Sequence, residues 1–331
     1  MPPTPTLIDI ARETNTSVST VSRVLAGGSV AERISEETRG RVLKAAKQMG
    51  YRPNLLARSL RTRKTYTVAM IVADISNPFF SQIASYVEQQ LHREGYSLVL
   101  CNSCEDPELE DEYLQLLPRK GIDGLILVPL MRGKKTLTEQ LPKNLPLVIL
   151  DRPIPGIAAS VSSDQDQMTQ SLCDTLERDG VKKVLLIAGP SNIYTHRRRA
   201  EIIAERFEVI ARHDGPAAPE TGRQAFVKTV DLEPDAVLAT NNFLAMGYAD
   251  AMENIDKPPV IGTFDDIPLM HMLPLPIVVS MQDIPMLADG CVRQLMPQLN
   301  GDTKRLEPIL LSTRVVTNRA FQARHNGKAE R

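Results

Sequence analysis

Residues 6–26 read TLIDIARETNTSVSTVSRVLA, which is two short helical patterns with a tight break between them. Thr6 can cap the first helix because Asp9 follows three residues later, which is the spacing of a capping box. Asn15 stands in the break, and asparagine tolerates the left-handed backbone that such a turn needs. Ser17 can cap the second helix in the same way. The stretch therefore predicts two helices joined by a short turn.

A third helical pattern begins after Ser35, with Glu36 and Glu37 in its first turn, where acidic side chains favour the helix dipole. The apolar residues of all three patterns recur at helical spacing, so the helices can pack around one small core. The expected core residues are Leu7, Ile10, Ala11, Thr14, Val21, Val24, Leu25, Val42, Ala45, Ala46 and Met49. A helix, a turn, a second helix and a supporting helix form the helix-turn-helix arrangement.

The outward face of the second helix carries side chains that can read DNA. Arg23 can donate two hydrogen bonds to O6 and N7 of a guanine, and Val18 can contact a thymine methyl group. Ser19 and Ser22 can hydrogen-bond to base edges or phosphate. The same pattern also suits the exposed polar face of a small helical domain. The residues predicted to contact DNA in this part of the chain are Thr6, Ser17, Val18, Ser19, Ser22, Arg23 and Arg33.

Residues 51–64, YRPNLLARSLRTRK, combine a small apolar face with a ring of basic side chains. Pro53 ends the preceding helix, and Asn54 can cap a new short one. Ala57 and Leu60 lie three residues apart on one face, and a helix of this length is unstable alone. The pattern favours a segment that folds on DNA, with Leu60 as a wedge in the minor groove. A basic linker is the alternative.

Charge is distributed unevenly along the 331 residues. Residues 1–65 hold 12 Lys and Arg against 5 Asp and Glu, whereas the remainder holds 27 against 35. This favours a polyanion as the partner of the basic head, with chance clustering as the alternative. The chain contains neither an apolar run long enough for a transmembrane helix nor the basic and apolar regions of a secretory signal. A soluble cytoplasmic protein of two or three domains is expected.

From Thr67 onward, short β-branched runs alternate with amphipathic stretches, which predicts parallel, doubly wound α/β sheets. The length of this part suits two lobes around a cleft, with the ligand at the carboxyl ends of the strands. Expected strands are Val68–Ala73, Ser97–Cys101, Leu125–Pro129, Leu147–Leu150, Val184–Ala188, Ala236–Thr240, Val260–Phe264 and Ile277–Met281, and expected helices include Phe79–Glu94, Gln165–Asp179 and Phe243–Glu253.

Polar side chains follow several of these expected strands directly. Carboxylates, amides and arginines at strand ends, with phenylalanines available to stack, describe a site for a polyhydroxylated ligand. An ordinary loop or cap role is the alternative for any one of them. The residues predicted to contact this effector are Phe79, Phe80, Asp151, Arg152, Thr195, Arg199, Asn241, Asp265 and Gln282.

The motifs TVSRVL (20–25), SEET (35–38), YRPN (51–54) and DISNPFF (74–80) together resemble the LacI (lac repressor) family of transcriptional regulators, and the resemblance continues almost to the C-terminus. It implies a helix-turn-helix head over 1–50, a hinge helix and linker over 51–65, and a periplasmic-binding-protein-like body over 66–331. The two lobes of that body would comprise about 66–163 with 283–312, and 164–282 with the C-terminal segment.

The resemblance also implies that effector contacts come from Phe79, Asp151, Arg199, Asn241, Asp265 and Gln282, and that a homodimer reads two half-sites of a pseudo-palindromic operator. Two departures leave the effector's identity open: Asn242 replaces the usual aspartate, and Ile202-Ile203 replaces a usual Gly-Phe. Other features, such as the long loop 27–34, resemble the fructose-repressor (catabolite repressor/activator) branch, whose members sense fructose phosphates. Residues 196–198, His-Arg-Arg, suit either phosphate support or a solvated helix face.

We therefore expect a ligand-responsive, sequence-specific DNA-binding repressor of carbohydrate-metabolism genes, released from its operator by a sugar, sugar phosphate or sugar acid. The alternatives are a regulator switched by a protein corepressor and a sugar-binding protein without a regulatory role. Neither a cofactor nor a metal is expected, because the pair Cys101 and Cys104 lacks the second pair that zinc needs. The familiar catalytic motifs are absent from the sequence, so we expect no enzyme. The expected location is cytoplasmic, on the nucleoid when bound to DNA.

Overall fold

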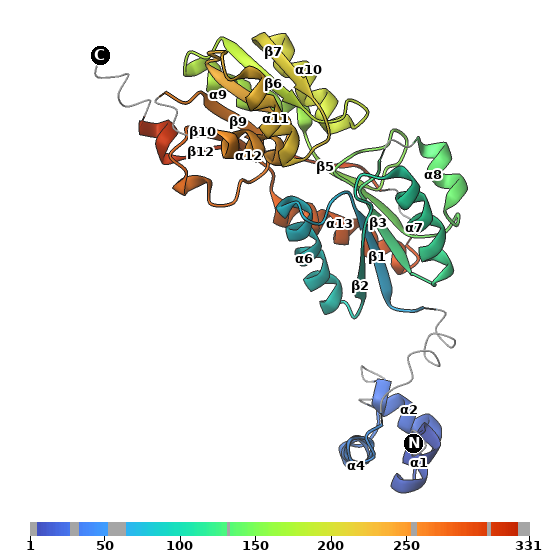
Figure 1. Ribbon diagram of the computed structural model, residues 1–331. Coiled ribbons are helices and arrows are strands. Elements are labelled where there is room, and N and C mark those ends of the chain that lie inside the picture. The colour runs from blue at the N-terminus through green and yellow to red at the C-terminus, as the bar shows by residue number, and fades with distance from the viewer. Residues whose placement is uncertain are drawn as a thin grey trace. The chain divides into compact units, whose positions relative to one another are not determined.

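The structure is a computed structural model, and it describes residues 5–26, 33–51, 64–130, 133–252, 257–302 and 306–323. The chain divides into two compact units between Thr65 and Tyr66. The first is helical, and the second contains two sheets with helices on both faces (Figure 1). Within the described ranges, no helix is long and apolar enough to cross a membrane.

The first unit is a helix-turn-helix head, as the sequence predicts. The capping box is present: Thr6 N donates to Asp9 Oδ2 at 2.8 Å, and Asp9 N donates back to Thr6 Oγ1. Asn15 ends the first helix in the left-handed region, at φ 48°. Ser17 Oγ accepts from Thr20 N at 3.1 Å and so caps the second. The helices described in this unit are α1 (Leu7–Thr14), α2 (Val18–Ala26) and α4 (Glu36–Gln48).

The core of the head lies where the apolar spacing places it. Ile10 of α1, Val21 of α2 and Val42 of α4 are fully buried against one another. The face of α2 that carries Val18 and Arg23 is exposed. The packing of this unit therefore leaves the polar face of α2 exposed to solvent.

The second unit consists of two lobes, and in its described residues each lobe is built on a six-stranded sheet. The amino lobe has the strand order β11-β5-β4-β3-β1-β2, and the carboxyl lobe has the order β12-β10-β9-β8-β6-β7. All paired strands are parallel except β12, which is antiparallel to β10. The strands are β1 (Thr67–Val72), β2 (Ser97–Asn102), β3 (Gly124–Leu127), β4 (Leu147–Leu150), β5 (Ser160–Ser163), β6 (Lys183–Ala188), β7 (Glu208–Asp214), β8 (Ala236–Ala239), β9 (Val260–Phe264), β10 (Ile277–Met281), β11 (Ile309–Leu311) and β12 (Arg314–Thr317).

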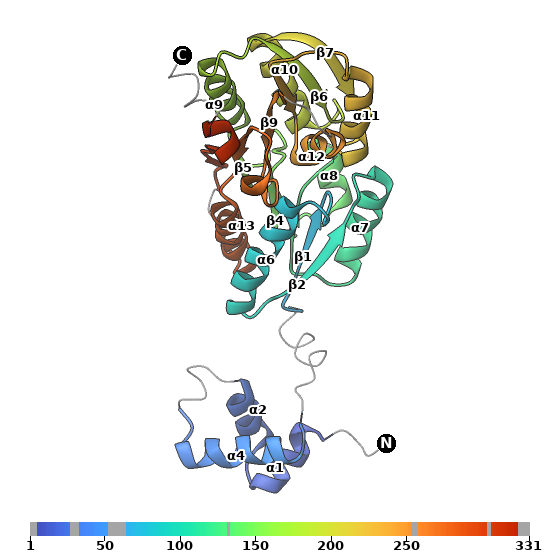
Figure 2. The ribbon, with the colours of Figure 1, turned by 60° about the vertical axis from the view of Figure 1, so that its left-hand side comes forward.

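Helices cover both faces of each sheet, and apolar cores fill the layers between. In the amino lobe, α6 and α13 pack side by side on one face and α7 lies on the other (Figure 2). In the carboxyl lobe, α9 and α10 share one core, and α11 and α12 share another. The helices are α6 (Pro78–Arg93), α7 (Pro107–Arg119), α8 (Lys134–Gln140), α9 (Gln165–Arg178), α10 (Tyr194–Arg206), α11 (Pro219–Thr229), α12 (Asn242–Ala251) and α13 (Ile284–Leu299).

The described chain passes between the lobes three times: after β5, after β10, and between β11 and β12. Each lobe therefore combines segments that are far apart in the sequence. α13, which follows the last long strand of the carboxyl lobe, returns to pack on α6 and on β4 and β5 of the amino lobe. This connectivity brings the carboxyl ends of both sheets to one cleft.

Glycines let α11 and α12 approach closely. A Cβ added to Gly247 would overlap the carbonyl oxygen of Pro219, and one added to Gly222 would overlap that of Leu244. Backbone atoms cannot swing aside as a flexible side chain can.

We expect Gly247→Ala to lower the free energy of unfolding by about 1–3 kcal/mol or more, because the methyl group forces the two helices apart. The better helix propensity of alanine opposes this by only about 1 kcal/mol. Gly40→Ala in α4 is the control, since no atom of the described residues lies within 4 Å of its added Cβ, and it should stabilise slightly. Urea unfolding of the full chain measures both. A midpoint that Gly247→Ala leaves unchanged or raises would contradict the close approach.

Candidate functional site

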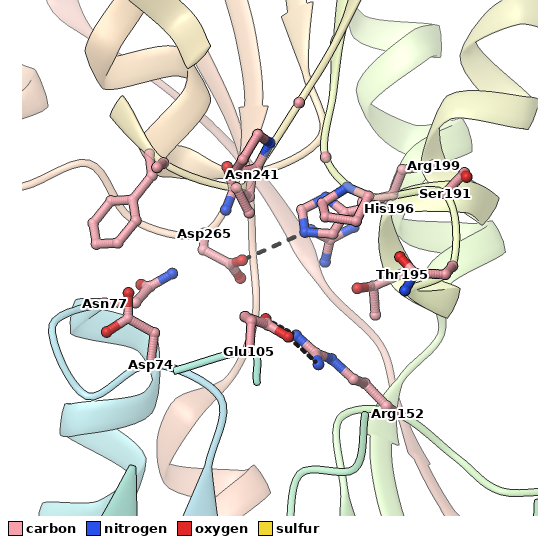
Figure 3. Close-up of a pocket in the computed structure, with 18 of the residues that line it drawn as sticks. Asp74, Asn77, Glu105, Arg152, Ser191, Thr195, His196, Arg199, Asn241 and Asp265 are labelled. Atoms are coloured by element: carbon pink, nitrogen blue, oxygen red, sulfur yellow. Dashed lines mark hydrogen bonds and ion pairs between the residues drawn. The ribbon is translucent and has the colours of Figure 1, made fainter. Parts of the chain in front are cut away.

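A cavity of about 1030 Å³ lies between the two lobes of the body (Figure 3). Its walls come mostly from loops at the carboxyl ends of the strands and from the first turns of α6, α10 and α12. Eight of the nine predicted effector residues line it: Phe79, Phe80, Asp151, Arg152, Thr195, Arg199, Asn241 and Asp265. The ninth, Gln282, lies behind the wall, where its Nε2 donates to Asp265 Oδ1 at 2.6 Å.

Two aspartates hold equivalent places in the two lobes. Asp151 is the first residue after β4, and Asp265 is the first after β9. Both have left-handed backbones, with φ 66° and 64°. Such a conformation is strained for a residue other than glycine and persists only where surrounding structure enforces it. Each lobe therefore uses the same turn to end a strand with a buried carboxylate in the cleft.

Arg199 of α10 is a buried cation in the carboxyl lobe. Its Nε donates to Gln165 Oε1 at 2.9 Å, and its Nη1 donates to Thr240 O at 2.8 Å. The guanidinium stacks 4.3 Å from the centre of the Phe264 ring, and Nη1 lies 3.8 Å from Asp265 Oδ2. Burial lowers the pKa of Arg199, and the nearby carboxylates partly offset this. These contacts fix the guanidinium beside Asp265, where it can donate to a ligand oxygen.

Arg152 forms a bidentate ion pair with Glu105 in the wall of the amino lobe. Nη2 lies 2.6 Å from Glu105 Oε1 and Nη1 lies 3.0 Å from Oε2. Figure 3 shows this pair across the cavity from Asp265. The strand-end pattern predicted Arg152 but not Glu105, because the partners are 47 residues apart and Glu105 belongs to no periodic pattern.

His196 and Arg198, two residues apart on α10, lie in different environments. His196 is buried, and its Nδ1 lies 2.8 Å from Thr240 Oγ1. Burial and the nearby arginines hold its pKa well below the usual value, so it is neutral at pH 7. Arg198 pairs with Asp166 through two contacts of 2.6 Å at the surface. The interpretation as a solvated helix face therefore describes Arg198. His196 matches neither interpretation, because it is a neutral side chain buried in the cavity wall.

An amide pair joins the lobes across the cleft. Asn77, at the start of α6, and Asn242, at the start of α12, each donate from Nδ2 to the other's Oδ1 at 3.2 Å. Asn242 Nδ2 also donates to Asp266 O at 3.0 Å. Both asparagines are buried. The substitution at 242 that the sequence analysis singled out thus makes a reciprocal contact that a carboxylate could not make.

Burial raises the pKa of Asp151 to about 6, although Arg152 and Arg199 act in the opposite direction. Between about pH 4 and pH 6 the folded protein therefore binds a proton that the unfolded chain has released. It follows that the free energy of unfolding falls as the pH rises through this window.

Asp151→Asn should remove this contribution while keeping the left-handed turn, which asparagine tolerates. The unfolding free energy of the variant minus that of the wild type should grow by on the order of 2 kcal/mol from pH 4 to pH 6. Urea unfolding at several pH values measures the difference, so that contributions from other carboxylates cancel. A difference that does not change with pH would contradict a protonated Asp151.

The predicted DNA-contacting residues of the head lie at its surface. Thr6, Ser17, Val18, Ser19, Arg23 and Arg33 are exposed and Ser22 is half-buried. Asn54, Ala57 and Leu60 lie outside the described residues. Among the described residues, no group of three or more His, Cys, Asp or Glu side chains is placed to hold a metal ion.

Comparison with known families gives matches to both units. Residues 6–54 match "Bacterial regulatory proteins, lacI family", and residues 65–257 match "Periplasmic binding proteins and sugar binding domain of LacI family". The chain belongs to the LacI family. A ribose operon repressor of Halalkalibacterium halodurans is a relative with 31% identity over 328 residues, which cover 94% of this chain and 97% of that repressor. The LacI family consists of transcriptional regulators, and this chain is one of them.

Two solved structures of regulators share the fold. The lac repressor dimer bound to operator and the anti-inducer ONPF has a TM-score of 0.82 at 21% identity, covering 96% of this chain and 99% of that one. The Cra transcriptional dual regulator of Pseudomonas putida, in complex with fructose 1-phosphate, has a TM-score of 0.68 at 24% identity, covering 76% and 98%. The predicted architecture of a helix-turn-helix head and a two-lobed body is confirmed.

Proposed function

We propose that this LacI-family regulator is a repressor whose cleft binds a neutral polyhydroxylated carbohydrate, and that binding releases the head from a pseudo-palindromic operator. The cavity between the lobes supports this, because carboxylates, amides and an arginine meet there beside Phe79. Such groups accept from and donate to sugar hydroxyls, and an aromatic ring can cover the apolar face of a sugar ring. The ribose operon repressor among the relatives makes D-ribose the first candidate.

The charges in the cavity wall favour a neutral ligand over a phosphorylated one. Its arginines already have carboxylate neighbours: Arg152 has Glu105, and Arg212 has Asp214 at 2.8 Å. Arg199 lies beside Asp265. Asp74 and Asp151 add further negative charge to the wall, and His196 adds none because it is neutral. A dianionic phosphate would meet a net negative surface, whereas sugar hydroxyls would meet acceptors.

On the DNA side, the proposal rests on the exposed face of α2. Arg23 and Val18 project from the helix that follows the tight turn, which is the helix that enters the major groove in helix-turn-helix proteins. Two heads are needed to read two half-sites, so the regulator is proposed to act as a homodimer in the cytoplasm. Exposed apolar side chains of the body are available for that contact: Tyr86, Val99, Leu100, Val227, Val230, Leu269 and Met272.

A thermal-shift screen of the full chain against neutral sugars, phosphosugars and sugar acids tests the proposed function. A ligand at 100 times its Kd stabilises the folded state by about 2.7 kcal/mol. We expect a neutral sugar to raise the Tm and to weaken operator binding in a gel-shift assay. Stabilisation by fructose 1-phosphate but by no neutral sugar would contradict the charge argument. A screen without any stabilising compound would shift the proposal to a protein corepressor.

A further inference from the structure

We propose that Glu105 determines which charge class of ligand the cleft accepts: it neutralises Arg152 and so makes the site reject phosphorylated sugars. The inference rests on the proposed function in one respect, namely that the cleft between the lobes is the ligand site. It concerns a residue that neither the strand-end pattern nor the comparisons point to.

The backbone around Glu105 is held in an uncommon conformation. Cys104 and Glu105, just after β2, are consecutive left-handed residues with φ 53° and 57°. Glu105 N donates to Ala73 O at 3.0 Å, which ties the turn to the end of β1. Two such residues in a row are costly and must be stabilised by their surroundings. The turn therefore fixes the position from which the Glu105 carboxylate reaches across to Arg152.

The partner of Glu105 is a cation almost completely removed from water. The side chain of Arg152 is 7% exposed, and both of its terminal nitrogens are engaged by the Glu105 oxygens. Nη1 is also 3.4 Å from Pro129 O. Among the described residues, Nε has no hydrogen-bond acceptor, and Asp151 Oδ2 lies 3.8 Å from it. Removing the Glu105 charge would leave a buried guanidinium that has lost its bidentate partner.

A guanidinium in that state is a phosphate site. Its two terminal nitrogens can donate to two phosphate oxygens as well as to a carboxylate. A buried cation that has lost its nearest counter-ion and both of its hydrogen-bond acceptors there favours an anion in that place, even though Asp151 remains 3.8 Å from Nε. Arg152 and Glu105 both line the cavity, so an anion on a bound sugar can reach the position that the carboxylate now fills. Glu105 thus occupies, within the protein itself, the place of a ligand phosphate.

The other arginines of the cavity differ in this respect. Arg199 uses Nε and Nη1 on the neutral oxygens of Gln165 and Thr240, so its hydrogen bonds do not depend on one carboxylate. Arg212 and Asp214 form their bidentate pair with side chains 45% and 52% exposed, where water screens the charges. The Arg152–Glu105 pair is therefore where one substitution should change the charge preference.

The test is Glu105→Gln in the full chain, which keeps the size of the side chain and removes its charge. Glu108→Gln is the matched control, because Glu108 is exposed on the first turn of α7 and does not line the cavity. Inorganic phosphate, D-ribose 5-phosphate and D-ribose are titrated by calorimetry and thermal shift in a chloride buffer. Glu105→Gln should bind inorganic phosphate and D-ribose 5-phosphate at least about 10-fold more tightly than the wild type, whereas Glu108→Gln should match the wild type.

The double variant Glu105→Gln/Arg152→Gln should lose this gain, because the guanidinium that binds the phosphate is gone. A gain that persists in the double variant, or a folded Glu105→Gln protein with unchanged phosphate affinity, would overturn the inference. Glu105→Asn repeats the test with a residue that suits the left-handed turn. Failure of D-ribose to bind the wild type counts against ribose as the ligand, and the inorganic phosphate titration still decides the role of Glu105.

Discussion

Asp265→Asn is expected to weaken carbohydrate binding by about 100-fold or more and to leave operator affinity unchanged in the absence of ligand. Asp265 is buried at the cleft, with Oδ1 accepting from Gln282 Nε2 at 2.6 Å and Oδ2 lying 3.8 Å from Arg199. Its carboxylate can accept from two neighbouring sugar hydroxyls, and hydrogen bonds to charged groups contribute about 1.5–3 kcal/mol each. Asparagine keeps the size and tolerates the left-handed turn, so the loss reports the charge.

Calorimetry with the stabilising sugar from the screen measures the affinity, and a gel shift measures operator binding. Asp231→Asn is the matched control, since Asp231 is an exposed aspartate of the same lobe and does not line the cavity. If operator binding fell together with sugar binding, Asp265 would be maintaining the fold of the lobe rather than contacting the ligand.

The second large effect is expected from Arg23→Ala. A bidentate contact from arginine to guanine contributes about 1–3 kcal/mol at one base pair. A homodimer places Arg23 in both half-sites, so the two losses together reach about 2–6 kcal/mol, which is roughly 30-fold to 10⁴-fold in operator affinity. Arg23 is exposed on α2, so the head should keep its fold.

The operator is first selected from randomised duplexes, and wild type and variant are then compared on it and on duplexes changed at single positions. Arg12→Ala, an exposed arginine near the end of α1, is the control for a general loss of positive charge. The variant should lose discrimination at one symmetric pair of positions. An equal loss on every duplex would show that Arg23 contacts only phosphate.

Local sequence patterns predicted the strands whose own residues and immediate neighbours determine where they begin and end. The ends of β4, β9 and β10 agree with the sequence analysis, because each of these short runs rich in β-branched residues directly follows a proline and ends before a polar residue. β5 was not predicted because its sequence is SVSS, yet it lies buried between β4 and β11. β7 escaped prediction because it is a charged edge strand with one parallel neighbour. Only neighbouring strands from elsewhere in the chain make these two segments strands.

The candidate site shows the same difference between features with local causes and features that depend on distant parts of the chain. Strand-end position predicted Asp151 and Asp265, because parallel sheets bring their carboxyl ends together wherever the strands lie in the sequence. Pairwise contacts were not predictable: Glu105 reaches Arg152 across 47 positions, and Asn77 reaches Asn242 across 165. Such pairs depend on how two lobes and several loops are placed in space. The local pattern of a single sequence does not indicate which distant residues come into contact.

The threefold passage of the chain between the lobes also sets an order of events on the ribosome. The amino lobe lacks α13 and its edge strand β11 until residue 311 has been made, although its sheet begins at Thr67. At about 5–20 residues per second, about 7–30 s separate the synthesis of β5, which ends at Ser163, from that of β11, which begins at Ile309. During that interval the apolar face of β4 and β5 is not yet covered by α13. Chaperones should therefore bind the nascent chain until its last segment emerges, and truncation before residue 284 should leave the amino lobe without α13 and β11 and the carboxyl lobe without its edge strand β12.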